Sequence, residues 1–384
     1  MSAASPIKLE VPTDFGCTEE HALLRAEARR FLEGRLPMKE LRKLADAGVG
    51  FDRTLWKELA QLGWVGLVLP ESHGGAGLGW LHLAIVMEEM GRRLVPGPFL
   101  GSLLAGIAIA EGGSAAQRER WLPGIASGDT VATIALCEPG GVFETSGISA
   151  TAEFANGVYV LRGQKTHVLC GTDANLVVAP FRESSGQIVL LAVELPAKGV
   201  SIEAEVGIDP TRPTARIAFD GVHVPAASRL DGDAAAAWHT MLVRGFAALA
   251  AEQVGGAESV LLETRDYAVT RKQFDRQIGF FQAVKHPIVD MMCGIELARS
   301  LALGAAAALD NNSAGAETLA RMAKAQISDV YCNAVRKGVQ LHGGYGFTWD
   351  CDVHFFFRRA MWSRAMLGDG IHHRRWLAER LFEG

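Results

Sequence analysis

The sequence predicts a mainly α-helical protein with a β-domain in the middle of the chain. In the first third, apolar residues recur with the period of a helix, whereas the centre consists of short β-branched segments. After Trp238 the helical pattern returns in long, alanine-rich segments. A chain of 384 residues is long for one domain. This order therefore predicts three domains, at residues 1–129, 130–236 and 237–384.

The composition is that of a soluble globular protein, with 49% hydrophobic and 21% charged residues. A formal net charge of −5 argues against a nucleic-acid surface. The first 16 residues lack the basic and apolar regions of a secretory signal, and no stretch has about 18 unbroken apolar residues. The six cysteines are scattered and lack the spacing of a zinc site. We therefore expect a cytoplasmic protein that binds no metal, nucleic acid or membrane.

Two helices and a glycine-rich loop are expected in the first domain. Leu23, Leu24, Ala28 and Leu32 recur with the period of a helix over 19–36, and a second helix over 54–62 ends at Gly63. The loop over 72–80 lacks the strand and the spacing of a nucleotide-binding fingerprint, so it is interpreted as a connection.

The middle domain is expected to be an antiparallel β-domain. Its β-branched residues alternate with polar ones, and glycine, proline and aspartate interrupt them at short intervals. The expected strands lie at 157–163, 175–181, 187–195 and 214–224.

The third domain contains two segments that carry chemistry. In TRKQFDRQIGFFQ (270–282), Arg271 and Phe274 are expected to end one helix and Gln282 to open the next. The planar, permanently charged guanidinium of Arg271 suits a pyrophosphate. Taken alone, this arginine is better explained as a solvated helix end.

In the second segment, QLHGGYGF (340–347), a helix is expected to stop at Gly343 and Gly344. Paired glycines let the backbone approach a ligand closely, and Gln340 adds an amide donor and acceptor. Taken alone, this segment is also an ordinary helix end followed by a turn.

Together, the two segments closely resemble those of the flavin-dependent acyl-CoA dehydrogenase family. The glycine-rich segment 63–79, CEPG at 137–140 and GQK at 163–165 extend the resemblance over nearly the whole chain. It implies an N-terminal helical domain, a β-barrel-like middle domain, a C-terminal four-helix bundle and assembly into dimers or tetramers. It also implies an FAD shared across a subunit interface. The residues that would hold its ADP half are Arg271, Phe274, Phe281, Gln282, Gln340, Gly343 and Gly344.

The catalytic base of this family is missing. Members oxidise an acyl-CoA thioester: a glutamate removes the α-proton while the flavin takes hydride from the β-carbon. One family position for the glutamate lies in a Tyr-Glu-Gly-Thr loop before the last helix, where residues 366–369 place Leu367. The other lies early in the first long C-terminal helix, where this chain has Gly245. Neither residue accepts a proton, so no catalytic residue is assigned.

Two nearby carboxylates are weaker candidates for the base. Asp369 lies two residues after Leu367, and a small shift of the loop could bring it inward. Glu252 lies two helical turns after Gly245, roughly 10 Å along the axis. We expect Glu252 to have a structural role, in an ion pair inside the bundle.

The flavin-ring half of the site also departs from the family pattern. Phe143 replaces the usual serine, and Leu169 replaces a threonine that bonds the flavin. His167 replaces the tryptophan that covers the ring; it is either a structural residue or a replacement donor or base.

The residues that depart from the family pattern all belong to the half of the site that would hold the flavin ring and the catalytic base. This asymmetry resembles the β chains of heteromeric α2β2 acyl-CoA dehydrogenases, which act in β-oxidation on bulky substrates such as steroid side chains. In such an enzyme a related α chain supplies the glutamate, the flavin-ring site and most of the acyl-CoA site. Three alternatives stay open: a self-sufficient homomeric enzyme that uses Asp369, a non-enzymatic scaffold chain without FAD, and a flavin monooxygenase.

Overall fold

The computed structural model describes residues 15–48 and 50–382. These residues form two compact units. The helical unit comprises the described residues up to Arg42, Gly79–Val95 and the described residues from Val243 onward, and the sheet unit comprises the rest. The predicted absence of a secretory signal concerns residues that lie almost entirely outside the described ranges. The three-domain division stays a prediction.

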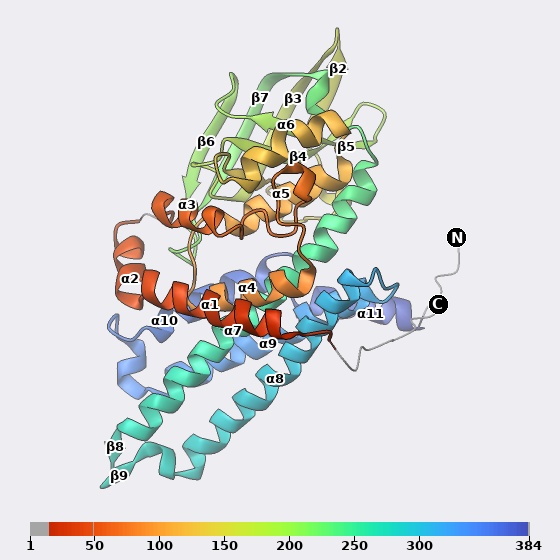
Figure 1. Ribbon diagram of the computed structural model, residues 1–384. Helices are drawn as coiled ribbons and strands as arrows, with labels where there is room; N and C mark the ends of the chain where they lie inside the picture. Colours follow the sequence, from red (N-terminus) through yellow and green to blue (C-terminus); the bar gives the residue numbers. More distant parts are fainter. Residues whose placement is uncertain (1–14, 49, 383–384) are drawn as a thin grey trace. The chain divides into compact units, whose positions relative to one another are not determined.

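The helical unit is a bundle in which α9 packs against α8, α10 and α11 (Figure 1). Alanines dominate the buried face of α8, which lets the helix backbones approach closely. The elements of this unit are α1 (Glu19–Arg35), α4 (Trp80–Arg92), most of α7 (Ala234–Thr270), β8 (Lys272–Gln273), β9 (Arg276–Gln277), η4 (Ile278–Phe280), α8 (Gln282–Asp310), α9 (Ala316–Leu341), η5 (Gly343–Phe347), α10 (Val353–Ala365) and α11 (Gly370–Phe382).

Helices α4 and α7 meet at two glycines. A Cβ added at Gly255 would lie 1.8 Å from the carbonyl oxygen of Glu88, and one at Gly91 would lie 1.9 Å from that of Glu252. Only glycine fits at either position, because the two backbones touch there. Around this crossing the buried carboxylate of Glu88 accepts a hydrogen bond from Arg299 Nε at 3.1 Å.

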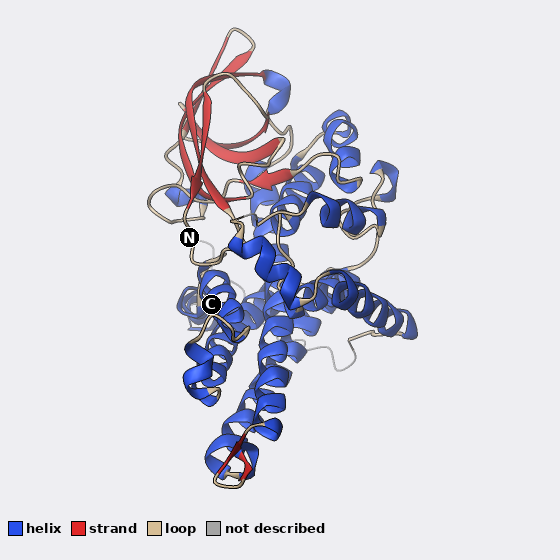
Figure 2. Ribbon diagram, turned by 90° about the vertical axis from the view of Figure 1, so that its left-hand side faces the viewer, coloured by secondary structure: helices blue, strands red, loops and turns tan. Residues whose placement is uncertain are grey.

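The sheet unit holds a curled seven-stranded sheet and several helices (Figure 2). The strand order is β1-β4-β2-β3-β7-β6, and β5 pairs with β4. Alternating apolar residues fill the inside of the curl, where Leu161, Phe181 and Ile217 are completely buried. The elements of this unit are α3 (Arg53–Gln61), η1 (Glu71–His73), α5 (Phe99–Gly112), α6 (Ala115–Ala126), β1 (Ala132–Ile134), η2 (Thr145–Gly147), β2 (Thr151–Ala155), β3 (Val158–Leu169), β4 (Leu176–Glu183), β5 (Ile188–Glu194), β6 (Val200–Glu205), β7 (Thr214–Pro225) and η3 (Ala226–Ser228). Helix α2 (Met38–Asp46) crosses from one unit into the other.

The mainly helical fold with a middle β-domain is confirmed, and two details are corrected. The sheet is mixed, because β4 pairs in parallel with β1 and β2; alternation of side chains shows a strand but not its direction. Helix α7 ends at Thr270, so Arg271 follows the helix, and Phe274 lies at the turn of the β8–β9 hairpin. Phe274 and Asp275 both have a positive φ, as a tight turn requires. Gln282 opens α8, as expected.

Among the described residues, one helix, α8, is long and apolar enough to cross a membrane by length and composition alone. Of its most apolar 18-residue window, 44% is buried inside the chain, and the helix packs against α4 and α9. These contacts are those of a bundle helix, so its apolar character needs no membrane to account for it.

Candidate functional site

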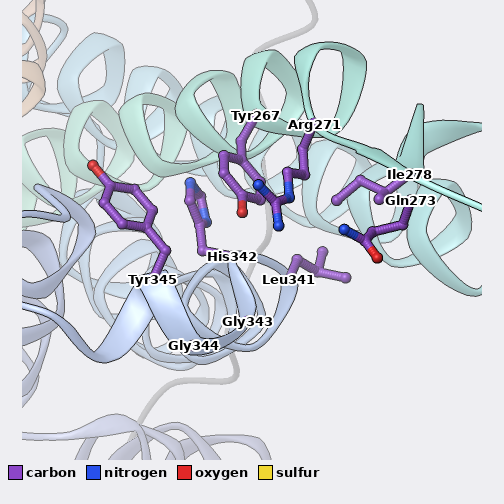
Figure 3. Close-up of a pocket in the computed structure, with 9 residues that line it drawn as sticks. All are labelled: Tyr267, Arg271, Gln273, Ile278, Leu341, His342, Gly343, Gly344 and Tyr345. Atoms are coloured by element: carbon purple, nitrogen blue, oxygen red, sulfur yellow. The ribbon is translucent and has the colours of Figure 1, made fainter. Parts of the chain in front are cut away.

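A pocket of about 610 Å³ opens where the C-terminal ends of α7 and α9 meet (Figure 3). One side comes from the end of α7 and the segment after it, and the other from the end of α9 and the turn that follows. Its lining residues are Tyr267, Arg271, Gln273, Ile278, Leu341, His342, Gly343, Gly344 and Tyr345.

The glycine turn forms an open wall of this pocket. Gly343 has φ +62°, a left-handed conformation that ends α9 and that other residues adopt at a cost. A Cβ added at Gly343 or Gly344 would meet no atom within 4 Å. Packing inside the chain therefore does not require glycine here, whereas close approach of a ligand to the backbone would.

Arg271 supplies positive charge to the pocket. Figure 3 shows its side chain extending from the end of α7 toward the glycine turn. In the described part of the chain, no hydrogen bond or ion pair engages its guanidinium, and no carboxylate lines the pocket. The arginine, the open glycine turn and the absence of acidic lining residues together suit a diphosphate.

The structure brings three of the predicted cofactor residues together in this pocket: Arg271, Gly343 and Gly344. Phe274, Phe281, Gln282 and Gln340 lie outside the pocket lining. The Phe274 and Phe281 rings meet edge to face at 6.0 Å, although Phe274 is 84% exposed. Gln282 and Gln340 are exposed at the start of α8 and the end of α9. The roles of all seven residues stay a prediction.

Sequence reasoning missed the aromatic side of the pocket. The rings of Tyr267 and His342 stack with centroids 4.5 Å apart, and Tyr345 lies nearly parallel to Tyr267 at 6.0 Å. One signal was available: Tyr267 precedes Arg271 by four residues, about one helical turn, which places both on the same side at the end of α7.

The loop at the first family base position is held by buried polar groups. Leu367 is 2% exposed and has φ +60°. Its carbonyl lies 3.0 Å from His373 Nε2, and the next carbonyl, of Gly368, accepts a 2.8 Å hydrogen bond from Lys324 Nζ. Gly245, at the second base position, is buried within α7. The first base position therefore carries an apolar side chain and the second carries a glycine.

The two substitute carboxylates have structural partners. Asp369 caps α11, because its Oδ1 accepts the backbone N–H of His372 at 2.9 Å. Glu252 is 2% exposed, and its Oε1 accepts a 2.5 Å hydrogen bond from Arg359 Nη1. The expected ion pair of Glu252 inside the bundle is thereby confirmed.

Lys324 makes the stability of this loop depend on pH. Burial lowers the pKa of its amine to about 7, from 10.5 in an exposed lysine. Between these values the unfolded chain holds a proton that the folded chain lacks, so the free energy of unfolding rises with pH. The gradient is at most about 1.4 kcal/mol per pH unit for one proton.

We expect Lys324→Met to lose this gradient. The difference in unfolding free energy between wild type and variant, measured by urea titration, should grow in favour of the wild type from pH 7.5 to 9.5. Lys337→Met, at an exposed position of the same helix, is the control and should follow the wild type. A constant difference between wild type and Lys324→Met over this range would show that Lys324 does not change its protonation on folding.

On the flavin-ring side, Phe143 and Leu169 are 9% and 2% exposed inside the sheet unit. Neither side chain offers a hydrogen bond. His167 is exposed on a bulge in β3, and its Nδ1 lies 3.2 Å from Glu205 Oε2 beside a pocket of about 410 Å³. The Glu205 carboxylate also accepts the backbone N–H of His167 at 2.9 Å, so Glu205 is the partner that the structure shows for His167.

CEPG and GQK, two segments that carry the resemblance, meet inside the sheet unit. Lys165 Nζ donates to Glu138 Oε1 at 2.7 Å, and both side chains are buried. Glu138 also accepts backbone N–H groups of Ser149 and Ala150. This contact was not expected from the sequence, and it ties the segment before β2 to β3.

Known proteins resemble this chain in both its N-terminal and its C-terminal part. Residues 18–129 match the acyl-CoA dehydrogenase N-terminal domain, and residues 235–382 match the acyl-CoA dehydrogenase C-terminal domain. The acyl-CoA dehydrogenase IpdE2 of Mycobacterium tuberculosis is 31% identical over 350 residues, which cover 91% of this chain and 93% of that protein.

Two solved structures with the same fold are each named after a pair of proteins. A chain of the ChsE4–ChsE5 complex from Mycobacterium tuberculosis has 27% identity and a TM-score of 0.88, with 97% of this chain and 100% of that one covered. A chain of a variant of the steroid acyl-CoA dehydrogenase Tcur3481–Tcur3483 has 32% identity and a TM-score of 0.86, with 97% and 99% covered.

Proposed function

Because the chain belongs to the acyl-CoA dehydrogenase family, we propose that it is the β-type subunit of a heteromeric member. In this proposal it supplies the ADP half of a shared FAD site, and a related α chain supplies the catalytic glutamate, the flavin-ring site and most of the acyl-CoA site. The observation that carries the proposal is the contrast between the two halves. The pocket with Arg271 keeps the features of a diphosphate site, whereas Leu367 and Gly245 stand at the base positions.

FAD is the cofactor of this family. When bound, it accepts the hydride that leaves the β-carbon of the acyl thioester. The described residues fit its diphosphate: Arg271 faces an open glycine turn where a Cβ would meet nothing, and no acidic side chain lines the space. In our proposal Arg271 pairs with the diphosphate while the backbone at Gly343 and Gly344 lies against it.

The structural contact of Asp369 argues against a self-sufficient enzyme that would use this residue as its base. As the cap of α11, its carboxylate already accepts a backbone N–H, and moving it inward would leave that helix end uncapped. Loss of such a cap costs about 1 kcal/mol. The carbonyl contacts of His373 and Lys324 also oppose movement of the loop.

The similar proteins support a paired assembly and a bulky substrate. One similar chain is named as part of the ChsE4–ChsE5 complex, and another belongs to a steroid acyl-CoA dehydrogenase. We extend both features to this chain: an α2β2 assembly in the cytoplasm that acts on an acyl-CoA with a large acyl group, such as a steroid side chain.

Removing the Arg271 side chain should weaken FAD retention in the assembled enzyme. A hydrogen bond to a charged group contributes about 1.5–3 kcal/mol, so Arg271→Ala should raise the dissociation constant of FAD by roughly 10- to 150-fold. Equilibrium dialysis with detection of flavin fluorescence measures this change directly.

Arg265→Ala is the matched control, since Arg265 lies on the same helix but pairs with Asp266 at the surface, outside the pocket. This control should retain FAD like the wild type. Equal FAD affinity in Arg271→Ala and wild type would remove the diphosphate assignment.

A further inference from the structure

Two histidine rings lie in contact where the first turn of α1 packs against α4 (Figure 1). His21 is 7% exposed and the side chain of His82 is 15% exposed. Their ring centroids lie 4.1 Å apart, at an interplanar angle of 41°. In the described part of the chain, no hydrogen bond engages Nε2 of His21 or either ring nitrogen of His82. Buried polar atoms without a partner are rare, so this pair calls for an explanation.

The backbone fixes the protonation state of His21. Its Nδ1 accepts the backbone N–H of Thr18 at 3.1 Å, and because an N–H only donates, Nδ1 carries no proton. The Thr18 hydroxyl, 2.9 Å from the same nitrogen, is then a donor as well. This contact is half of a capping box, in which the third residue of a helix reaches back to its N-cap residue. His21 therefore caps α1 in this way only while Nδ1 is free of a proton.

Charged and titratable groups face His21 from each of the three helices that meet here. Glu20 on α1 and Asp310 on α8 favour a protonated ring, whereas His82 on α4 opposes it. The Asp310 carboxylate is already engaged, because it accepts two backbone N–H groups at the start of α4, at 2.5 and 3.0 Å. Burial, followed by the neighbouring ring, outweighs the two carboxylates and lowers the pKa of His21 from its usual 6.5.

Protonation of His21 would remove the acceptor of the Thr18 N–H and place a charge against the neighbouring ring. Both costs disappear when the first turn of α1 leaves α4, because a ring in water has its ordinary pKa of about 6.5. The docked turn therefore has its full stability above pH 6.5 and loses stability as the pH falls below that value. The following turns are held separately, since Arg25 forms ion pairs with two carboxylates of α4 at 3.0 and 3.3 Å.

We propose that His21 and His82 form a pH-sensitive latch, which holds the first turn of α1 on α4 while His21 is neutral and releases it when His21 takes up a proton. The latch is a conformational device of this chain alone. It uses no residue of the Arg271 pocket and does not depend on the proposed function.

Hydrogen exchange followed by mass spectrometry tests the latch in the full-length chain between pH 8 and pH 5. After correction for the intrinsic pH dependence of exchange, the protection of amides in the first half of α1 should be constant above about pH 6.5. Below that value it should fall by up to about tenfold per pH unit, the limit for one linked proton. A peptide from the buried helix α5 reports global unfolding and should keep its protection.

His21→Gln is the discriminating variant, because glutamine at this position also completes a capping box but does not titrate. Its protection should be independent of pH over this range. His82→Gln removes the ring that opposes the charge and should make the fall smaller. His286→Gln, at an exposed position of α8, is the matched control and should follow the wild type.

Constant protection of α1 in the wild type from pH 8 to pH 5 would overturn the latch. An equal fall in α5 would also overturn it, because the whole chain would then be unfolding. A folded His21→Gln that keeps the wild-type fall would show that another group is responsible. The wild-type profile needs no variant, so it decides the matter even if His21→Gln does not fold.

Discussion

Without a partner chain, this protein is expected to show no acyl-CoA oxidation at ordinary enzyme rates. A positioned general base contributes about 10²–10⁴-fold in rate, and orientation of the flavin against the β-carbon contributes further. Leu367 and Gly245 stand where the base is needed, and Phe143 and Leu169 offer no hydrogen bond to a flavin. Addition of a related chain that carries the glutamate should therefore raise turnover by at least the roughly 10²–10⁴-fold that a general base contributes.

The assay uses an artificial electron acceptor and a panel of acyl-CoA thioesters, including steroid ones, with and without the candidate partner. Leu367→Glu serves as the control. It restores a carboxylate but not the flavin-ring site, so the variant should also be silent alone. Turnover by the wild-type chain alone would contradict the account, and Asp369→Asn would then test the remaining carboxylate. Robust activity of Leu367→Glu alone would show that the ring site is intact.

Glu252→Ala is expected to lower the free energy of unfolding by about 3–5 kcal/mol. The reason is that Arg359, itself only 1% exposed, would keep a buried charge without its carboxylate partner. Urea unfolding followed by circular dichroism measures the change. This effect is far larger than that expected for a surface ion pair, about 0–1 kcal/mol.

The matched control replaces both partners by apolar residues of similar size. Glu252→Leu combined with Arg359→Met should recover most of the lost stability, since neither charge remains buried. In the assembled enzyme the double variant should also keep its turnover. Normal stability of Glu252→Ala together with lost turnover would instead identify Glu252 as a base and contradict its structural role.

The fold was largely predictable because its signals are local. Helical periodicity, β-branched alternation and the glycines after Leu341 each specify structure over a few residues. The sequence predicted a helix end at Gly343, for example, and Gly343 follows α9 in a left-handed conformation. The same locality explains why Gln282 was correctly placed at the start of α8.

What the sequence could not show depends on contacts between distant segments. The parallel pairing of β4 with β2 joins residues about 30 positions apart, and no local pattern encodes it. The burial of Lys324 in α9 is another such case, because its amine donates to the carbonyl of Gly368, which lies 44 residues later in the chain. The stacking of His342 against Tyr267 likewise joins two residues that are 75 positions apart.

The central claim is that this chain completes one half of a cofactor site, and counting FAD tests it most directly. The complex with the α chain is purified, and its bound flavin is released and compared with total protein. We expect one FAD per pair of chains, because in our proposal only the α chain supplies a flavin-ring site. We also expect no FAD on this chain alone and loss of the flavin when the complex carries Arg271→Ala. Two FAD molecules per pair, or a stably flavin-loaded chain without its partner, would contradict the account.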